Sequence, residues 1–443
     1  MLAPRTLNGL LDLAEFPTES ILDSARAMAK FSLFDWLVVA RAGAGEPVSR
    51  IVRDLVAEEG GKPVASVVGL AGKLPARAAA LANGAISHAL DYDDTHFAHV
   101  GHPSAAVLPA ALALGEARDA SAAQVLDALL IGAEASIRIG IVLGRPHYER
   151  GFHQTATAGA FGATVASARM LGLTREETRQ ALSLVATRAS GLKSQFGSMG
   201  KPFNAGIAAS NGVEAAALAA RGFVSCDDGV GGPQGFIDAH VDEVFEDTAW
   251  SVPRGVFLFE DIKHKLHACC HGVHAAIEAL AEAQRAHRFD AESVASVTIR
   301  TNPRWLKVCD LKRPRTGLEA KFSYNMVTAM TLHGVDTASD AVYTDALCQN
   351  PELIAVRSTV TVVGDEAISD TGAVVRIETR AGETVDVGHD LSVRLPAETL
   401  EKGLRAKAAA LVGAGSAEKL WETVASLPTR SARDLGDILR GLR

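Results

Sequence analysis

Hydrophobic residues recur with helical spacing through most of the first half of the chain. In residues 19–43 they return every three or four positions, which predicts a helix that ends at Gly43. Ser121 has the hydroxyl side chain that favours the N-cap of a further helix. Residues 157–173 and 208–223 are rich in small side chains, which lets helix backbones approach closely. Because no apolar–polar alternation occurs in this half, we expect helices only up to about residue 255.

The hydrophobic pattern changes in the remaining part of the chain. Residues 293–301 and 357–365 alternate and contain β-branched side chains, as half-buried strands do. Residues 373–391 predict a hairpin with Gly382 at its turn. Helical stretches lie between these strands, and the C-terminal tail is helical again.

These two patterns predict a multidomain α and α+β protein, in which a large all-helical domain is combined with a smaller α+β domain. We expect the helical domain to comprise residues 1–255, joined by C-terminal helices in residues 397–443. The α+β domain then comprises residues 256–396. A crevice between two such domains is a preferred location for a small-molecule site.

Composition and charge narrow the class of protein. The 443 residues are 48% hydrophobic and 22% charged, with a formal net charge of -8 and no basic run, which argues against nucleic acid as a partner. No run of about 18 apolar residues occurs, so we expect no membrane-spanning segment. The five cysteines are few and odd in number, and the N-terminus lacks the pattern of a secretion signal. We therefore expect a reduced, cytoplasmic protein.

Titratable side chains are concentrated in residues 88–102, which contain four histidines and three aspartates. Pro103 follows directly and starts an apolar helix. Polar groups at a helix N-terminus are well placed to hold an anion or a carboxylate, so Asp91, Thr95 and His102 are candidate site residues. The alternatives are that the aspartates only cap the helix and that each histidine is a hydrogen-bonded structural residue.

A second cluster, residues 263–274, combines lysines, histidines and two cysteines. Its ligand spacing fits no common zinc pattern, and His267, His271 and His274 would simply share one face of a helix, so we expect no metal. Lysine beside such a cluster suits carboxylate binding, and a partly buried lysine with a lowered pKa also serves as a base. Lys265 is therefore a further candidate.

Two other polar stretches precede glycine-rich helices. Tyr148 and His153 lie before one of them, and Lys201 lies in a turn flanked by Gly197 and Gly200 before another. Glycine permits backbone angles that point N–H groups at a ligand. The alternative is that Lys201 has a solvated side chain, as most lysines in loops do.

Several cofactor and nucleophile motifs are missing from the chain. No strand leads into G-x-G-x-x-G, no G-x-x-x-x-G-K-[ST] occurs, and neither G-x-S-x-G nor H-E-x-x-H is present. Dinucleotide, P-loop, serine-hydrolase and zinc-protease chemistry are therefore not expected. What remains is acid–base chemistry by side chains, without a cofactor.

The order of several motifs resembles that of the MmgE/PrpD family, which includes 2-methylcitrate dehydratase, cis-aconitate decarboxylase and iminodisuccinate epimerase. The matching stretches include "ALDYDDTH", "HPSAAVLPAALAL", "GFHQTATAGAFGATVASARMLGL", "SMGKPFNAGIAASNG" and "KLHACCHGVHAAIEA", and they cover nearly the whole chain. The resemblance implies a large helical domain with a smaller α+β lid domain, a homodimer and no cofactor. It also implies an active site in the crevice between the domains.

The family's site positions fall on residues that the patterns already single out. The resemblance implies roles for Asp91, Thr95, His102, His153, Lys201 and Lys265. We expect all of these except Thr95, for which we make no such prediction, to converge on one crevice. With Tyr148 and His267 added from the polar stretches, the candidate catalytic residues are Asp91, His102, Tyr148, His153 and Lys265. The candidate substrate-binding residues are Thr95, Lys201 and His267, and no metal ligand is expected.

Three departures from the family pattern bear on the reaction. Cys270 stands where decarboxylase-type members carry a histidine, and Asn204 stands where dehydratase-like members commonly carry one. Met326 replaces a usual tyrosine, with Tyr324 two positions earlier. The missing groups are candidate proton donors, which weakens both the decarboxylase and the dehydratase interpretation.

The reaction that we expect from these residues is epimerisation of a small amino or imino dicarboxylate such as iminodisuccinate. Proton abstraction and return at the α-carbon need carboxylate binding, but no acid for a departing hydroxide. The alternative is a hydro-lyase of the 2-methylcitrate dehydratase type or a decarboxylase of a tricarboxylate. A third hypothesis, an inactive family member that binds carboxylates, is weaker because the candidate residues are retained together.

Overall fold

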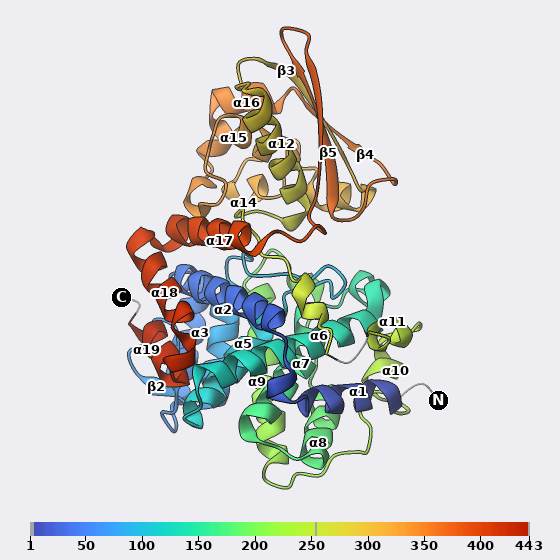
Figure 1. The fold of residues 1–443 in the computed structure, drawn as a ribbon, viewed down its shortest axis with the longest axis vertical. Helices are drawn as coiled ribbons and strands as arrows, with labels where there is room; N and C mark the ends of the chain where they lie inside the picture. Colours follow the sequence, from blue (N-terminus) through green and yellow to red (C-terminus); the bar gives the residue numbers. More distant parts are fainter. Residues whose placement is uncertain (1–3, 253–254, 442–443) are drawn as a thin grey trace. The chain divides into compact units, whose positions relative to one another are not determined.

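The structure is a computed structural model that describes residues 4–252 and 255–441 of the chain. It divides into two compact units: the larger comprises Met1–His264 and Gly415–Arg443, and the smaller comprises Lys265–Ala414. Figure 1 colours the chain from blue at the N-terminus to red at the C-terminus. The larger unit is mainly helical and the smaller unit combines helices with a sheet, which confirms the expected fold class.

Helices build most of the larger unit, as the spacing of its apolar residues predicts. The helix expected to end at Gly43 does so, and the Ser121 side chain caps another by accepting a hydrogen bond from the backbone N–H of Gln124. The helices described in this unit are α1 (Pro4–Ala14), α2 (Asp23–Gly43), α3 (Pro47–Glu59), α4 (Ala76–Ser87), α5 (Pro103–Ala117), α6 (Ala122–Arg150), α7 (Gln154–Leu171), α8 (Arg175–Ala186), α9 (Gly200–Ala219), α10 (Phe236–His240), α11 (Glu246–Trp250), α18 (Ala414–Ala425) and α19 (Ala432–Arg440).

The expectation of helices only before residue 255 is wrong at one point. Two-residue strands, β1 (Ala65–Ser66) and β2 (Lys73–Leu74), form a small antiparallel ladder. The buried carboxylate of Glu116 in α5 holds both strands, because it accepts hydrogen bonds from the Ser66 backbone N–H at 2.6 Å and from the Lys73 ammonium at 2.9 Å. Strands this short have no alternation to detect in a sequence.

Small residues bring α9 into close contact with α4, α5 and α7. A Cβ atom on Gly84 of α4 would lie 2.8 Å from the Cα of Gly206 in α9, and one on Gly206 would lie 2.3 Å from the carbonyl oxygen of Leu81. Real Cβ atoms essentially never approach so closely, so this crossing requires glycine on both helices. The small-residue stretches thus form closely packed helices, as expected.

The smaller unit is built on a four-stranded sheet with the strand order β4–β3–β5–β6. β3 (Val294–Thr301) runs parallel to β4 (Val360–Gly364) and antiparallel to β5 (Gly372–Thr379), which forms the expected hairpin with β6 (Thr384–Asp390). Gly382 has a φ of +85° in the hairpin turn. The helices described in this unit are α12 (His274–His287), α13 (Leu306–Cys309), α14 (Gly317–Ala320), α15 (Tyr324–Leu332), α16 (Pro351–Arg357) and α17 (Ala397–Val412).

One long helix covers the sheet of the smaller unit. α12 packs against β5 and β6, and α15 packs against α12 (Figure 1). On β3 and β5, Val297, Ile299, Val375 and Ile377 are buried, as the alternation of apolar residues predicts. The core of this unit therefore lies between the sheet and its helices.

The C-terminal helices divide between the two units. The ring of Trp421 in α18 lies 5.1 Å from that of Phe34 in α2, so this part of the tail packs on the helical unit. α17 belongs to the smaller unit, where the Leu266 side chain lies against Gly403. From the sequence we expect all of residues 397–443 on the helical domain. Residues 397–414 belong instead to the smaller unit, and residues 442–443 lie outside the described part of the chain.

The division between the units near residue 264 has a structural cause. The backbone of Lys263 pairs with that of Thr95 through two hydrogen bonds, of 2.8 and 2.7 Å. The His264 ring lies 3.1 Å from the Ser32 hydroxyl in α2. These contacts keep both residues in the larger unit, beyond the expected limit at residue 255.

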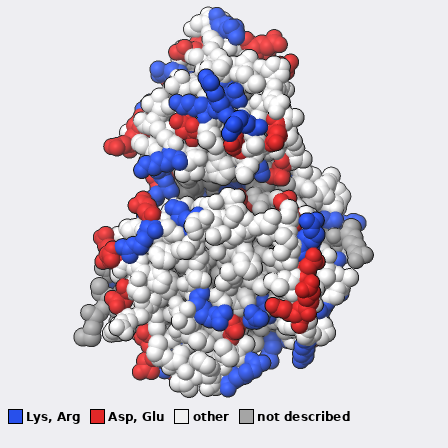
Figure 2. Space-filling view, turned by 180° about the vertical axis from the view of Figure 1, so that it is seen from behind, with Lys and Arg blue, Asp and Glu red and all other residues white. Residues whose placement is uncertain are grey.

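Charged side chains of both signs are mixed on the surface. On the face drawn in Figure 2, basic and acidic groups lie side by side on the smaller unit, and the larger unit shows a broad area without charge. Arg376 of β5, for example, donates two hydrogen bonds to Asp386 of β6, at 2.8 and 2.7 Å. This mixture differs from the basic stripe typical of nucleic-acid-binding proteins. Within the described residues, no helix has the length and apolar character to cross a membrane.

Candidate active site

Three helices of the larger unit begin next to one another and carry candidate residues at their first positions. His102 is the N-cap of α5, His153 is the N-cap of α7, and Lys201 is the second residue of α9. The backbone N–H of His102 donates to the Thr155 hydroxyl at 3.1 Å, which joins α5 to α7. The Asn204 amide lies 3.3 Å from Nδ1 of His153, which joins α9 to α7. Helix N-termini carry positive potential, so this meeting point favours anions.

Lys201 lies inside a helix rather than in the turn that we expected. α9 already begins at Gly200, after Ser198 donates its hydroxyl to the carbonyl oxygen of Gln195 at 2.8 Å. The ammonium of Lys201 is therefore positioned by the first turn of a long helix, and the alternative of a solvated loop lysine does not apply.

A chain of close contacts links five side chains of this region. Nζ of Lys201 lies 2.6 Å from Oδ1 of Asp91, and the same oxygen lies 3.2 Å from Nε2 of His102. On the other side of the His102 ring, Nδ1 lies 3.1 Å from Oδ2 of Asp93. Oδ1 of Asp93 in turn accepts a hydrogen bond from Nδ1 of His88 at 2.9 Å. Two basic side chains and two carboxylates therefore alternate, with His88 at the buried end.

Electrostatics give the members of this chain different protonation states. Burial alone would lower the pKa of His102, but the Asp93 charge and the contacts with Asp91 raise it above its usual value. Burial would raise the pKa of Asp93, yet His102 and His88 hold it well below its usual range. Burial lowers the pKa of His88, and burial with the neighbouring cations lowers that of His153 well below the ordinary value. The cluster therefore favours the protonated form of His102 and the neutral forms of His88 and His153.

The two aspartates that flank His102 differ in exposure. The Asp91 side chain is 36% exposed, whereas that of Asp93 is 1% exposed. Asp91 also has a φ of +52°, a left-handed conformation that aspartate tolerates better than most residues. Asp91 therefore faces the accessible side of the cluster, and Asp93 forms its buried base.

The third aspartate of the loop caps a helix, as the alternative interpretation held. The Asp94 carboxylate accepts hydrogen bonds from the backbone N–H and the hydroxyl of Ser104, at 3.2 and 2.5 Å. Burial raises its pKa to about 7, against the hydrogen bond from Ser104. Asp94 thus fixes the start of α5, which is a structural role.

Two further candidates of the larger unit lie next to this cluster. Thr95 belongs to the same loop and is held through its backbone by Lys263. Tyr148 lies under the Lys193 ammonium, 3.6 Å from its ring centre, and 6.5 Å from the ring of Phe196. The Phe196 ring packs edge-on against that of His153 at 5.0 Å, so Tyr148 lies one aromatic side chain away from the cluster.

The candidates of the smaller unit form their own cluster. Lys265 is buried, and its charge contributes to lowering the pKa of His274, after burial and the neighbouring histidines. Both ring nitrogens of His267 are engaged, with the Thr337 hydroxyl at 2.7 Å and the Glu278 carboxylate at 3.1 Å. His267 is thus held by protein groups on both sides. The convergence of Lys265 with the residues of the larger unit stays a prediction.

The expectation that His267, His271 and His274 share one helical face is wrong for His267, which precedes the helical segments. α12 begins at His274, and the preceding backbone bonds to other segments, with the N–H of Ala268 donating to Thr337 and that of Cys270 to Lys321. The rings still gather, because those of His267 and His271 lie 5.0 and 4.6 Å from that of His274. Tertiary hydrogen bonds bring His267 to the other two rings, whereas His271 begins a short 3-10 helix (His271–Val273) that leads into α12.

Tyr324 does not substitute for the tyrosine that Met326 replaces. Its hydroxyl donates to the carbonyl oxygen of Gly272 at 2.7 Å and lies 3.1 Å from the Thr301 hydroxyl. Met326 is also fully buried. Both side chains therefore belong to the core of the smaller unit.

Four side chains of the larger unit approach the spacing of a metal site. Ligand atoms of His88, Asp91, Asp93 and His102 all lie within 4.8 Å of one another. They already contact one another, and the Lys201 ammonium lies on Asp91, so positive charge is supplied by the protein itself. We interpret the group as an acid–base cluster.

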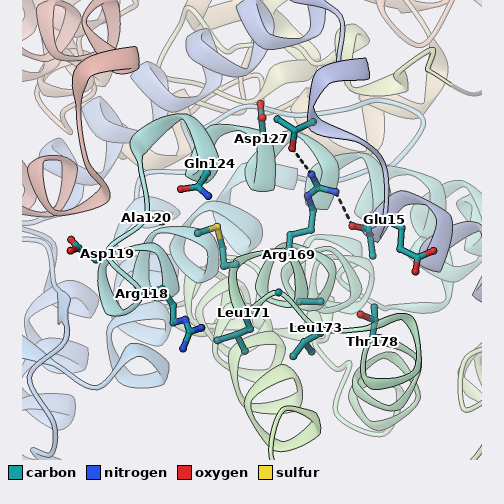
Figure 3. Close-up of a pocket in the computed structure, with 15 residues that line it drawn as sticks. Glu15, Arg118, Asp119, Ala120, Gln124, Asp127, Arg169, Leu171, Leu173 and Thr178 are labelled. Carbon is teal, nitrogen blue, oxygen red and sulfur yellow. Dashed lines mark hydrogen bonds between the residues drawn. The ribbon is translucent and has the colours of Figure 1, made fainter.

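A separate cavity of about 640 Å³ opens elsewhere on the larger unit (Figure 3). Its lining mixes both charges, and the guanidinium of Arg169 points from α7 toward the N-terminal segment. That guanidinium donates to the carbonyl oxygen of Ala14 at 2.7 Å and to the Thr18 hydroxyl at 3.2 Å. None of the candidate site residues lines this cavity, so it is distinct from the acid–base cluster.

Sequence reasoning did not single out His88. It stands at the C-cap of α4, five residues before its hydrogen-bond partner Asp93, within the stretch rich in titratable residues. Its ring also lies 5.9 Å from that of His153, which is distant in the sequence. The stretch contained the signal, but only the fold shows which of its histidines face one another.

Family models match both parts of the chain. The model of the MmgE/PrpD N-terminal domain matches residues 13–247, and that of the MmgE/PrpD C-terminal domain matches residues 267–427. This chain belongs to the MmgE/PrpD family. The family resemblance of its motifs is thereby confirmed, and the acid–base cluster lies in the part that matches the N-terminal domain.

Similar proteins within this family include several cis-aconitate decarboxylases. A cis-aconitate decarboxylase-like protein of Aspergillus oryzae is 29% identical over 289 residues, 61% of this chain and 60% of that protein. The cis-aconitate decarboxylase of Aspergillus terreus is 30% identical over 60% of this chain and 58% of its own length. That of Homo sapiens is 35% identical over 34% of this chain and 32% of its own. The chain thus matches at most about 60% of the length of these curated relatives.

Proposed function

We propose that this protein is a lyase that removes carbon dioxide from a tricarboxylate of the cis-aconitate kind, without a cofactor. The observation that carries the proposal is the position of His102, which lies between two carboxylates that favour its protonated form, at the point where three helices begin. A protonated imidazole beside the Lys201 ammonium combines a proton donor with groups that bind carboxylates. The names of the relatives support the same class of reaction.

Decarboxylation requires one proton donor and groups that hold the remaining negative charge. The bond between a carbon and its carboxylate breaks, carbon dioxide leaves, and the electron pair moves through the adjacent double bond to a carbon that takes a proton. In this proposal His102 gives that proton and afterwards regains one from water. Lys201 and the positive potential at the starts of α5, α7 and α9 hold the other carboxylates, in competition with Asp91.

The epimerase that the sequence led us to expect is the second candidate. Asn204 supports it, because it replaces a candidate proton donor of dehydratase-like members and contacts Nδ1 of His153. An epimerase, however, needs a base on one face of the carbon and an acid on the other. Burial lowers the pKa of both His88 and His153, which makes them weak bases. A lyase with one protonated donor therefore agrees better with this cluster.

A comparison of substrates in deuterated water tests the proposal. The protein is incubated with cis-aconitate, 2-methylcitrate or iminodisuccinate, and the products are followed by NMR and by carbon dioxide release. We expect carbon dioxide from cis-aconitate only, with one deuterium on a product carbon and a rate that a metal chelator leaves unchanged. An alkene and water from 2-methylcitrate would favour a dehydratase. Exchange with inversion on iminodisuccinate, without carbon dioxide, would favour the epimerase.

A matched pair of variants tests the role of His102 in the same assay. His102→Gln should lower the rate roughly 10²- to 10⁴-fold, the usual contribution of a general acid. The control is His99→Gln, because His99 is an equally buried histidine of the same loop that contacts the Ser136 hydroxyl at 3.1 Å instead of a carboxylate. Equal losses in the two variants would contradict the proposal.

We also propose that the protein is a homodimer, as its family resemblance implies. Leu192, Phe196 and Met199, in and next to the loop before α9, are exposed apolar side chains of the kind that subunit contacts cover. Light scattering after gel filtration should give twice the mass of one chain at micromolar concentration. A monomer mass under these conditions would overturn this part of the proposal.

A further inference from the structure

His88 occupies the buried end of the acid–base cluster. Its side chain is almost completely buried, and its ring lies 4.6 Å from that of His102 and 5.9 Å from that of His153. The ring is edge-on to His102 and nearly parallel to His153. Because His88 ends α4, both its backbone and its ring are held in place.

The two contacts of the Asp93 carboxylate differ in quality. Oδ1 accepts a hydrogen bond from Nδ1 of His88 at 2.9 Å. Oδ2 lies 3.1 Å from Nδ1 of His102, but the N–H direction there is too poor for a hydrogen bond, so this contact is an ion pair. The hydrogen bond from His88 is therefore the contact that orients the carboxylate toward His102.

The other ring nitrogen of His88 supports a specific role for the residue. Asp93 is ionised, so a neutral His88 must carry its proton on Nδ1 and leave Nε2 as an acceptor. Nε2 is buried and has no hydrogen-bond partner among the described residues. A buried acceptor without a donor destabilises a protein, and a side chain that only filled space would avoid this cost.

We propose that His88 is a positioning residue, which holds Asp93 against His102 and thereby sets how tightly His102 keeps the proton that it donates. This inference deepens the proposed lyase function and rests on the donor role of His102. Asp93 is too deeply buried to act on a substrate directly, so His88 acts through Asp93 and His102.

The sign of the effect follows from the hydrogen bond that His88 gives. A donor to a carboxylate stabilises its charged form, so loss of the donor makes the Asp93–His102 pair bind its proton more tightly. The sign of this change is the same whether the shared proton is on His102 or on Asp93. A pair that binds its proton more tightly is a weaker acid, so turnover should fall while substrate affinity changes little. The groups that surround His102, from the loop and from α4, α7 and α9, are Asp91, Asp93, His88, His99, His153 and Lys201.

Two substitutions at position 88 separate this role from a merely structural one. His88→Leu keeps much of the volume but lacks the donor, whereas His88→Asn places an amide N–H near the position of Nδ1. The titration of the His102 ring is followed by NMR, without any substrate. We expect His88→Leu to raise the apparent pKa of the pair and to lower kcat up to about 100-fold, with the high-pH limb of the rate moved to higher pH. His88→Asn should restore both toward the wild-type values.

The NMR titration distinguishes failure of this inference from failure of the proposed lyase function, since it needs no turnover. His99→Asn is the matched control, because it removes a buried histidine of the same loop without a donor to Asp93. An unchanged titration of His102 in His88→Leu, or equal behaviour of the Leu and Asn variants, would overturn the proposal. If His88→Leu does not fold, His88→Gln, whose amide extends past the position of Nδ1, replaces it and must show the same upward shift.

Discussion

The crossing of α4 and α9 can be tested by replacing Gly206 with alanine. The added Cβ would lie 2.3 Å from the carbonyl oxygen of Leu81, whereas ordinary van der Waals contact begins at 3.4 Å. The obstacle is the backbone of α4, which cannot turn aside as a flexible side chain would. The two helices must therefore separate by about 1 Å to accept one methyl group.

Two opposing effects set the size of the change in stability. Alanine is more favourable than glycine inside a helix by about 1 kcal/mol. Overpacking of a well-packed core typically costs about 1–3 kcal/mol, so the net loss in the free energy of unfolding is up to about 2 kcal/mol. Catalysis should be more sensitive, because Lys201 and Asn204 lie on the same helix. A displacement of about 1 Å reduces a rate up to about 100-fold.

Gly415→Ala in α18 is the matched control, since a Cβ there would have no atom within 4 Å. Urea unfolding of both variants measures stability, and kcat/KM with a substrate that the wild-type protein turns over measures the site. The control should be up to about 1 kcal/mol more stable than the wild-type protein, because alanine favours the helix, and it should keep the wild-type rate. The reasoning is refuted if Gly206→Ala is as stable as the control and equally active.

Three further experiments, two substitutions and one labelling reaction, test other features of the structure. Asp93→Asn removes the buried charge that raises the pKa of His102, so that pKa falls, and a pH–rate profile should show activity lost at lower pH than in the wild-type protein. Glu134→Gln leaves the buried Arg138 without its anionic partner at 2.7 Å and should lower the free energy of unfolding in urea by about 3–5 kcal/mol. A variant as stable as the wild-type protein would show that the pair contributes nothing. Cys226 is exposed, so it should react first with a thiol reagent; a fast phase larger than one thiol would contradict this.

The predictable parts of the fold are those with local signals. The helix end at Gly43, the N-cap at Ser121 and the helix start at Pro103 each depend on a few neighbouring residues, and the structure places all three as expected. The strands were predictable because β-branched alternation persists over several residues. β1 and β2 are too short to carry such a pattern, and Glu116, far along the chain, holds them.

Several residues of the acid–base cluster could be picked out from the sequence, but their contacts could not. Motif order pointed to Asp91, His102, His153 and Lys201, and the structure brings these four together. Sequence spacing could not show that His102 contacts two carboxylates or that His88 lies beneath it. These contacts depend on where three helices begin relative to one another, which is a property of the packed fold.

The glycine contacts between α4 and α9 also determine how the site can change. The contact between these helices is made by main-chain atoms, which cannot change rotamer as side chains can. The separation of the two helices is therefore set by main-chain geometry. New substrate preferences are therefore more accessible through the loops that enter the helices, residues 89–101 without Asp91 and Asp93 and residues 191–199, than through the helices themselves. A library confined to these loops would vary the shape and charge of the site while the frame that aligns its groups stays unchanged.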